Sequence, residues 1–366
     1  MGHTIAMCTN LSSGNLSFVY LRAGKPYSFK QTSDGVWHPD SSEGGQPIAV
    51  PTQSTLTFSA IKGINGNGSS LSGAALLAID SNGGLWYTTQ DNSDNWQAGG
   101  FNQLPNIRDA LGNVCLYKNV DAAWVGQRGL FVVTPASDPG GTLGNASLYC
   151  QLLFPSAAPQ PIPYTSQVES AAMAAISPGG TPTAVAVALG AGLQVVWAGS
   201  DGVNWNAKDS NNFPLGGTIA ALAVGGNATL QALVLDQNGV PYLAWDASGN
   251  GTNFVTYAEN SGMLPNQNNI GFSALAAASG NQGNLQVVGI GKTDGLPYLF
   301  WQDAASGSWS GCYQLPIDTS APGLSDLCTG MGSQQYLQVG YLGTDGKVYV
   351  NWQDTNGNWG WYGPLP

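Results

Sequence analysis

The stretch that decides the fold is LQVVGIGKTDGLPYLFWQD, which occupies residues 285–303. It returns near the C-terminus as LQVGYLGTDGKVYVNWQD, residues 337–354, and a third copy spans residues 230–246. Looser copies carry Gly-Lys-Pro-Tyr, which ends at Tyr27, and Gly-Leu-Trp-Tyr, which ends at Tyr87. Self-similarity of this kind is typical of repeat architectures, in which each copy forms one structural unit.

Two degenerate copies, which keep only Gly-x-x-Val, complete a set of seven. The fourth residue of each copy serves as its marker, and the markers are Tyr27, Tyr87, Val132, Val195, Tyr242, Tyr298 and Tyr349. Their average spacing is about 54 residues, a period typical of propeller repeats. Seven such units fill the chain and leave no sequence for a second domain.

Each unit predicts four short strands that are separated by turns. In the sixth unit these strands are residues 272–278, 285–291, 296–302 and 308–315. The breaks between them are rich in Gly, Asn and Asp, which supply the positive φ angles that tight hairpins need. The second strand is continuously apolar, as expected for a sheet that is covered on both faces.

Four strands in about 50 residues predict an all-β, seven-bladed β-propeller with four antiparallel strands per blade. A β-sandwich array would need larger units, and a β-helix would need shorter ones. The whole chain is then a single domain. The expected blades are residues 1–51, 52–105, 106–161, 162–217, 218–265, 266–316 and 317–366.

Every blade is expected to be contiguous, because the chain opens with a first strand, residues 5–9, and closes with a last strand, residues 359–365. The ring would then close by side-chain packing, without a strand exchanged between the first and last blades. Cys8 and Cys328 occupy matching places in these two blades. A disulfide is one alternative, and burial of two free thiols is the favoured one, since free Cys is common in cores.

The charge balance excludes several classes of partner. The net charge is −11, with 10 Lys and Arg against 21 Asp and Glu, and there is no basic run. Nucleic acid and anionic membrane surfaces are therefore not expected partners. The sequence has no apolar window long enough to insert into a membrane and no recognisable secretory signal. We expect a soluble protein that acts extracellularly, and we leave a homo-oligomer open.

Residues suited to catalysis or metal binding are scarce. The chain holds only two His, three Glu and three Arg, and its five Cys form no Cys-x-x-Cys motif. Most Asp residues lie in turns. We therefore expect no enzymatic activity, no metal and no cofactor. A glycosidase with paired carboxylates is a third-ranked alternative.

Aromatic side chains are the candidate ligand contacts. In the fifth to seventh units the predicted third strand repeats Tyr, Trp and Asp, and a second aromatic follows on the outermost strand, where we expect exposure at blade junctions. One interpretation is packing between blades. The other is stacking on the apolar face of a sugar, with the Gln or Asp that follows each Trp and turn backbone groups as hydrogen-bond acceptors. The candidate sugar-binding residues are Tyr87, Trp96, Tyr242, Trp245, Asp246, Tyr298, Trp301, Asp303, Trp309, Tyr349, Trp352, Asp354 and Trp359.

The repeated pattern of residues 285–309 and 337–359, with its Asp-Gly-x-x-Tyr-x-x-Trp-Gln-Asp core, resembles the seven-bladed propeller lectins first known from Photorhabdus. The resemblance implies binding of fucose and O-methylated sugars between adjacent blades, and agglutination of cells that carry such glycans. The third and fourth units depart from the pattern, so pockets beside them are expected to be inactive. The hypothesis is a non-catalytic, multivalent lectin whose partners are glycans. The second-ranked alternative is a protein-interaction or toxin-associated scaffold propeller.

Overall fold

A computed structural model describes the protein from residue 3 to residue 365. The stretches it leaves undescribed are residues 33–34, 39–44, 51–55, 67–70, 72, 109–113, 118, 126–129, 138–146, 154–159, 163–167, 169, 177–182, 190–192, 199–203, 211–216, 226–228, 257–263, 267–268, 280–283, 304 and 333–336.

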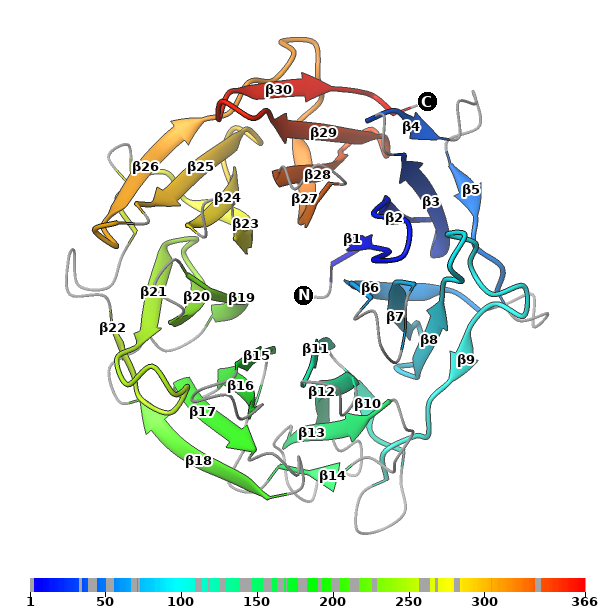
Figure 1. Cartoon of the computed structure of the whole chain (residues 1–366), viewed down its shortest axis with the longest axis vertical. Coiled ribbons are helices and arrows are strands. Elements are labelled where there is room, and N and C mark those ends of the chain that lie inside the picture. Colours follow the sequence, from blue (N-terminus) through cyan, green and yellow to red (C-terminus); the bar gives the residue numbers. More distant parts are fainter. Residues whose placement is uncertain are drawn as a thin grey trace.

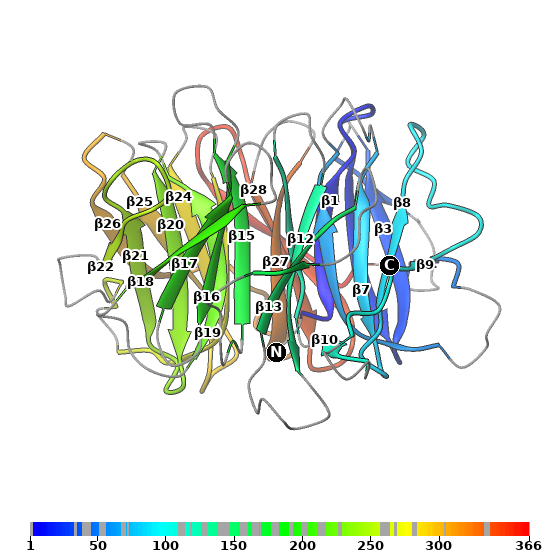
Figure 2. The ribbon, with the colours of Figure 1, turned by 90° about the horizontal axis from the view of Figure 1, so that it is seen from below.

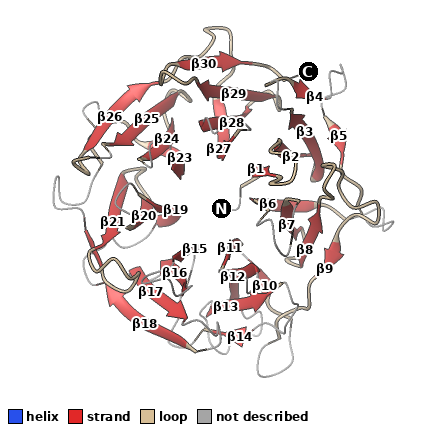
Figure 3. Cartoon of the chain, in the orientation of Figure 1, coloured by secondary structure: helices blue, strands red, loops and turns tan. Residues whose placement is uncertain are grey.

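The described strands form seven antiparallel sheets, which stand around a common axis (Figure 1). The sheets lie side by side with their strands running from one face of the ring to the other (Figure 2). Strands are the only regular elements in the described part of the chain (Figure 3), so it contains no helix that could cross a membrane. The fold is an all-β β-propeller, and each sheet has a path of four antiparallel strands.

We number the sheets 1 to 7 in chain order. Sheet 1 contains β1 (Ile5–Thr9), β2 (Leu16–Arg22), β3 (Lys25–Gln31), β4 (Trp37–His38) and β5 (Gln46–Pro47). Sheet 2 contains β6 (Phe58–Ile64), β7 (Ala75–Asp80), β8 (Leu85–Thr89) and β9 (Asn102–Gln103). Sheet 3 contains β10 (Leu116–Tyr117), β11 (Asp121–Trp124), β12 (Leu130–Ser137), β13 (Ser147–Leu152) and β14 (Gln160–Pro161).

Sheet 4 contains β15 (Ser170–Ile176), β16 (Thr183–Leu189), β17 (Leu193–Ala198) and β18 (Trp205–Ser210). Sheet 5 contains β19 (Gly217–Val224), β20 (Leu230–Asp236), β21 (Pro241–Asp246) and β22 (Phe254–Thr256). Sheet 6 contains β23 (Phe272–Ser279), β24 (Leu285–Gly291), β25 (Pro297–Gln302) and β26 (Trp309–Gln314). Sheet 7 contains β27 (Leu324–Met331), β28 (Leu337–Gly343), β29 (Val348–Gln353) and β30 (Trp359–Tyr362).

The predicted strands of the sixth unit are confirmed to within a residue at each end, and β1 matches its prediction. The last strand is shorter than predicted, since β30 ends at Tyr362, just before Gly363 and Pro364. Pro has no backbone N–H to donate to a strand ladder, so the pairing stops there. The second strands are buried along nearly their whole length, as their apolar runs predict.

The marker of the third unit was placed on the wrong strand. Val132 lies in β12, which is the second strand of sheet 3, and the third strand is β13, which carries Tyr149. A Gly-x-x-Val pattern occurs in second and third strands alike, because both are rich in β-branched residues. Tyr149 therefore takes the place that the prediction gave to Val132.

The repeated Leu-Pro ends have a structural role. The leucines donate their backbone N–H to the first carbonyl of the third strand in their own sheet, over 2.8 to 3.0 Å. Each leucine is also buried, at 5% exposure or less, so it anchors the chain as it leaves the sheet. The residues are Leu104, Leu264, Leu315 and Leu365.

Sheets 1 and 7 meet without an exchanged strand among the described elements, as predicted. Their shared core includes Met7 and Phe18, which occupy space left free by Gly330 and Gly340. All five cysteines are free, so Cys8 and Cys328 are not joined. Burial raises the pKa of the Cys8 thiol to about 12, which keeps it protonated and unreactive at neutral pH.

Candidate functional site

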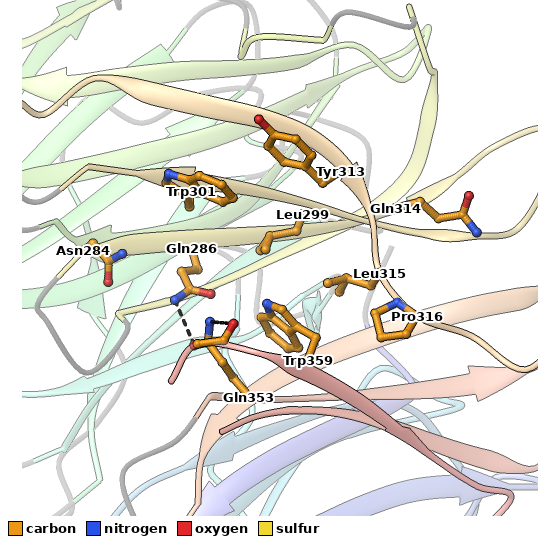
Figure 4. Close-up of a pocket in the computed structure, with 11 residues that line it drawn as sticks. Asn284, Gln286, Leu299, Trp301, Tyr313, Gln314, Leu315, Pro316, Gln353 and Trp359 are labelled. Carbon is orange, nitrogen blue, oxygen red and sulfur yellow. Dashed lines mark hydrogen bonds between the residues drawn. The ribbon is translucent and has the colours of Figure 1, made fainter. Parts of the chain in front are cut away.

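A cavity of about 280 Å³ lies between sheets 6 and 7 (Figure 4). Strands β25 and β26 supply one side of it, and the β29–β30 hairpin of sheet 7 supplies the other. Its lining residues are Asn284, Gln286, Leu299, Trp301, Tyr313, Gln314, Leu315, Pro316, Gln353, Gly357 and Trp359.

Aromatic rings face each other across this cavity. The rings of Trp301 and Tyr313 stack on one side with centroids 5.0 Å apart and planes 10° apart. They are 37% and 49% exposed, which is high for such large side chains. Trp359 of sheet 7 lies opposite them, with Leu299 between (Figure 4). Exposed, oriented rings of this kind offer flat apolar faces to a ligand.

Two amides form the polar part of the lining. Gln286 Nε2 donates to Gln353 Oε1 across the sheet junction over 3.2 Å, and Gln353 Nε2 donates to the carbonyl oxygen of Gly357. The Oε1 atom of Gln286 is buried and has no hydrogen-bond partner among the described residues. Buried acceptors usually have a partner, so this oxygen is a candidate acceptor for a water or a ligand hydroxyl.

The described residues of the lining include no Asp, Glu, Lys, Arg or His. A charged ligand would lose its hydration there without gaining an opposite charge. Aromatic faces combined with a few neutral amides suit an uncharged ligand that has one apolar face and several hydroxyl groups.

The predicted Trp residues of the third strand lie at the surface. Trp245, Trp301 and Trp352 are 36%, 37% and 43% exposed, whereas packing between blades would have buried them. Trp301 lines the cavity, and the other two hold the same position in sheets 5 and 7.

The predicted Tyr partners do not line this cavity. Residues three apart in a strand point to opposite faces, so Tyr298 lies on the other face of β25 from Trp301. Tyr298 and Tyr349 are buried, and their hydroxyls donate to Asp294 and Asp345 over 2.7 and 2.9 Å. Burial, reinforced by these carboxylates, raises the pKa of each to about 12. Tyr242 packs in the same manner, half-buried beside the core that sheets 4 and 5 share.

The predicted Asp acceptors are turn residues. Asp303 accepts the backbone N–H of Ser306 over 2.7 Å, and this bond holds the Asp303 pKa below its usual range. Asp354 accepts from Asn358, and buried Asp246 accepts the N–H of Gly251 over 2.6 Å. Such Asx turns already use the carboxylate oxygens, so the predicted hydrogen bonds to a ligand are not supported.

The outermost aromatics divide into two groups. Trp359 lines the cavity as expected, but Trp309 is only 6% exposed and belongs to the core between sheets 5 and 6. Trp96 is half-buried against the core shared by sheets 1 and 2. Exposure was therefore wrongly expected for Trp309, because the sheet that precedes it covers the start of β26.

Strand pairing identifies one position in every sheet that corresponds to Trp301, and we call it the stacking position. In sheet 6, Gln302 pairs with the outermost aromatic Trp309, and the stacking position is the residue before Gln302. The same rule assigns the position in sheets 1, 2, 4, 5 and 7, where the residues that pair with the outermost aromatic are Gln31, Gln90, Ala198, Asp246 and Gln353. In sheet 3 the position is assigned from the second strand instead. Leu152 pairs with Phe131, the second residue of β12, just as Trp301 pairs with Gln286, the second residue of β24. The stacking positions are Lys30, Thr89, Leu152, Trp197, Trp245, Trp301 and Trp352.

This register corrects two sequence assignments. In sheet 2, Trp86 takes the place of Tyr298, since its indole N–H donates to Asp80 over 2.7 Å. Tyr87 therefore faces away, and it packs on the core between sheets 2 and 3. In sheet 4, the marker Val195 lies one residue beyond Gln194, which is the true equivalent of Tyr298. Trp197 was therefore missed. Nothing in the sequence indicated Tyr313. Gln286 was also missed, although the repeated Leu-Gln pair gave a signal for it, and Gln353 was indicated only as the Gln that follows Trp352.

The described residues give little support to catalysis. Six aspartates have shifted pKa values, and in all six the pKa is lowered, whereas a general acid needs a raised one. No group of three or more His, Cys, Asp or Glu suited to a metal occurs in the described part of the chain. Glu43, Glu169 and Glu259 lie outside the described residues.

Comparisons with known proteins bear on the fold alone. No family model matches the chain, and no curated protein does. Among solved structures, it is similar to BP39L lectin from Burkholderia pseudomallei, with 17% identity, coverage of 100% and 98% of the two chains, and a TM-score of 0.70.

It is also similar to the lectin of Aleuria aurantia, a six-bladed propeller with a fucose recognition mode, with 14% identity, 100% and 96% coverage, and a TM-score of 0.52. A third similarity is to BBS1N in complex with ARL6DN, with 12% identity, 98% and 94% coverage, and a TM-score of 0.55. At these identities the likeness establishes a β-propeller and does not choose between a lectin and a scaffold.

Proposed function

We propose that the protein is a non-catalytic, multivalent lectin with seven blades, one for each sheet and with the boundaries expected from the repeats. It binds neutral sugars, fucose-like or O-methylated, in pockets between adjacent blades. The observation that carries this proposal is the cavity between Trp301, Tyr313 and Trp359, which has an amide lining and no charged group.

Sugars match this cavity chemically. A pyranose ring presents one face of C–H groups, which can stack on Trp301, and hydroxyls that can donate to the unpartnered Oε1 of Gln286. The lectins of Burkholderia pseudomallei and Aleuria aurantia show that comparable propellers serve as lectins, and the second recognises fucose. We propose that the partners are glycans on cell surfaces, which the protein would meet outside the cell.

Single sites of this kind are expected to be weak. A dissociation constant near 1 mM corresponds to only about 4 kcal/mol of binding free energy. Several sites on one rigid ring can raise the apparent affinity for a glycan-covered surface by about 10² to 10⁴. Agglutination of cells would follow where such sites reach two surfaces.

A glycan array followed by calorimetry with methyl α-L-fucoside tests the proposal. We expect binding to fucosylated or O-methylated glycans that free monosaccharide inhibits. A silent array would overturn it, and so would capture of a protein partner that sugar does not compete. Turnover of a chromogenic glycoside would instead support a glycosidase.

A further inference from the structure

We infer that the ligand-binding junctions are confined to one arc of the ring, and that the partner is therefore a surface or branched chain that presents clustered copies of a neutral sugar to one side of the molecule. This inference rests on the proposed function. It concerns the number and placement of the sites, which that function leaves open.

The three exposed tryptophans at the stacking position belong to consecutive sheets. Trp245, Trp301 and Trp352 lie on the third strands of sheets 5, 6 and 7, at the left and top of the ring in Figure 1. They face the junctions between sheets 5 and 6, 6 and 7, and 7 and 1.

These three junctions share the same polar connection. Gln231 donates to Gln302 over 2.7 Å between sheets 5 and 6, as Gln286 does to Gln353 between sheets 6 and 7. Gln338 donates to Gln31 between sheets 7 and 1. In each pair the donor's own Oε1 is buried and unpartnered among the described residues, so each junction offers the same acceptor.

The junction between sheets 7 and 1 also repeats the aromatic wall. Tyr362 is 49% exposed, like Tyr313. The two tyrosines hold the same place on the fourth strand, because each pairs with the residue that lies two before the stacking position, Val350 for Tyr362 and Leu299 for Tyr313. Leu365 takes the place of Leu315 beside it. The ring seam therefore repeats some of the residues that line the cavity between sheets 6 and 7, namely an exposed Trp, an exposed Tyr and a buried Leu.

The junction between sheets 1 and 2 is blocked by charge. Lys30 holds the stacking position, and its Nζ lies 2.6 Å from Oδ2 of Asp94 in sheet 2. Asn15 also donates to the same carboxylate oxygen over 2.7 Å. This ion pair occupies the place of the aromatic ring and leaves no neutral, apolar face for a sugar.

At the remaining junctions, the described residues include no ring as exposed as Trp245, Trp301 or Trp352. Thr89 of sheet 2 is 5% exposed, and Leu152 of sheet 3 packs against the neighbouring core. Trp197 of sheet 4 is half-buried in the core between sheets 4 and 5, where Lys208 bridges to Asn253 over 2.7 Å. Aromatic stacking is therefore available only along the arc from sheet 5 to sheet 1, within the described part of the chain.

Sites confined to one arc favour clustered ligands. Neighbouring sites on a rigid ring can engage copies on the same surface at once, which raises apparent affinity by about 10² to 10⁴. We expect each single Trp variant to lose a large part of that gain on a fucosylated surface while free sugar binding at the two intact junctions is unchanged.

Native mass spectrometry of the full chain with methyl α-L-fucoside counts the sites directly. We expect at most three bound sugars, at most two in each of Trp245→Ala, Trp301→Ala and Trp352→Ala, and none in the triple variant. Trp197→Leu is the matched control, and it should bind as many sugars as the parent chain. If the triple variant does not fold, the three single variants still test the count.

More than three bound sugars, or sugar retained by the folded triple variant, would overturn the inference that the sites are confined to one arc. The lectin proposal would remain intact. A wild-type chain that binds no glycan on an array would overturn the lectin proposal itself, and the arc with it.

Discussion

At the scale of single residues, the side chain at the stacking position determines whether a junction presents an aromatic face. Trp301 and Lys30 occupy the same strand position, yet the first is exposed beside a neutral cavity and the second is held in an ion pair. In both sheets the next residue is a Gln that pairs with a Trp of the fourth strand. We therefore expect any difference in sugar binding between these junctions to come from side-chain chemistry.

We predict that Trp301→Ala weakens sugar binding at the junction between sheets 6 and 7 at least tenfold, or about 1.4 kcal/mol, because the stacking face is lost. Trp301→Phe should retain part of the affinity. Calorimetry on a background that carries Trp245→Ala and Trp352→Ala isolates this site. Tyr298→Phe is the control, since its hydroxyl lies on the other face of β25 and bonds to Asp294. Equal affinity in Trp301→Ala and the parent would contradict the assignment.

Asp246 allows stability to be separated from binding. Its buried carboxylate accepts N–H groups from Ser248 and Gly251 over 3.1 and 2.6 Å. Asp246→Ala leaves these donors unpaired, so we expect the free energy of unfolding to fall by about 1–3 kcal/mol. Denaturant titration measures this change. Sugar binding beside the neighbouring Trp245, at the junction between sheets 5 and 6, should persist, and its loss in a chain of unchanged stability would show that Asp246 contacts the ligand.

At the scale of elements, strands of neighbouring sheets are joined by amide pairs. Gln231 in β20 reaches Gln302 in β25, and Gly225 leaves the space that the pair fills. A side chain at Gly225 would collide with the Gln231 amide. The third strand of one sheet is thereby fixed against the second strand of the sheet before it, which holds the junction at a set width.

A double-mutant cycle tests this connection. We expect Gln231→Ala and Gln302→Ala each to destabilise the fold, and the double variant to be less destabilised than their sum by about 1 kcal/mol, the usual net value of a hydrogen bond. Thermal and denaturant unfolding provide the measurements. Strict additivity would show that the two amides act independently.

Element boundaries were largely predictable from sequence, and side-chain orientation was not. Turn residues and apolar runs were enough to identify β23 to β26. Successive side chains of a strand point to opposite faces, so an error of one residue in the register reverses the face predicted for every side chain. That error hid Trp197 and placed Tyr87 on the wrong face. The turn bonds of the Asp residues were not predictable either, because sequence alone does not show that their oxygens accept turn N–H groups.

At the scale of the whole molecule, the ring closes through a carboxylate that the sequence analysis did not identify. Asp326 in β27 accepts from the backbone N–H and the hydroxyl of Thr4, over 2.6 and 2.8 Å, and lies 2.8 Å from the His3 ring. With no strand exchanged at the seam, these bonds add to the packing of Met7 and Phe18. They join the first strand of the chain to the last sheet.

The seam should be sensitive to acid. Burial alone would raise the pKa of Asp326, but hydrogen bonds and charge from His3, together with bonds from Thr4, hold it below its usual value of 3.8. A carboxyl group whose pKa is lowered by folding adds stability above its unfolded pKa, and this stability is lost as the pH falls through the folded pKa. We expect Asp326→Asn to be less stable than the parent at neutral pH and to lose less stability between pH 5 and pH 2.

Unfolding curves across this pH range make the comparison. Asp318→Asn is the comparison away from the seam: the Asp318 pKa is also lowered, by its bond from Ser320, but the residue is exposed, so we expect a smaller change in the pH profile than in Asp326→Asn. An Asp326→Asn variant with the parent's pH profile would show that the seam does not depend on the carboxylate.

The most direct test of the account is a crystal structure of the protein soaked with methyl α-L-fucoside. We expect a sugar whose C–H face lies on Trp301, between Tyr313 and Trp359, with a hydroxyl bonded to Gln286. A sugar bound only elsewhere on the ring, with the cavity between sheets 6 and 7 holding none, would contradict it.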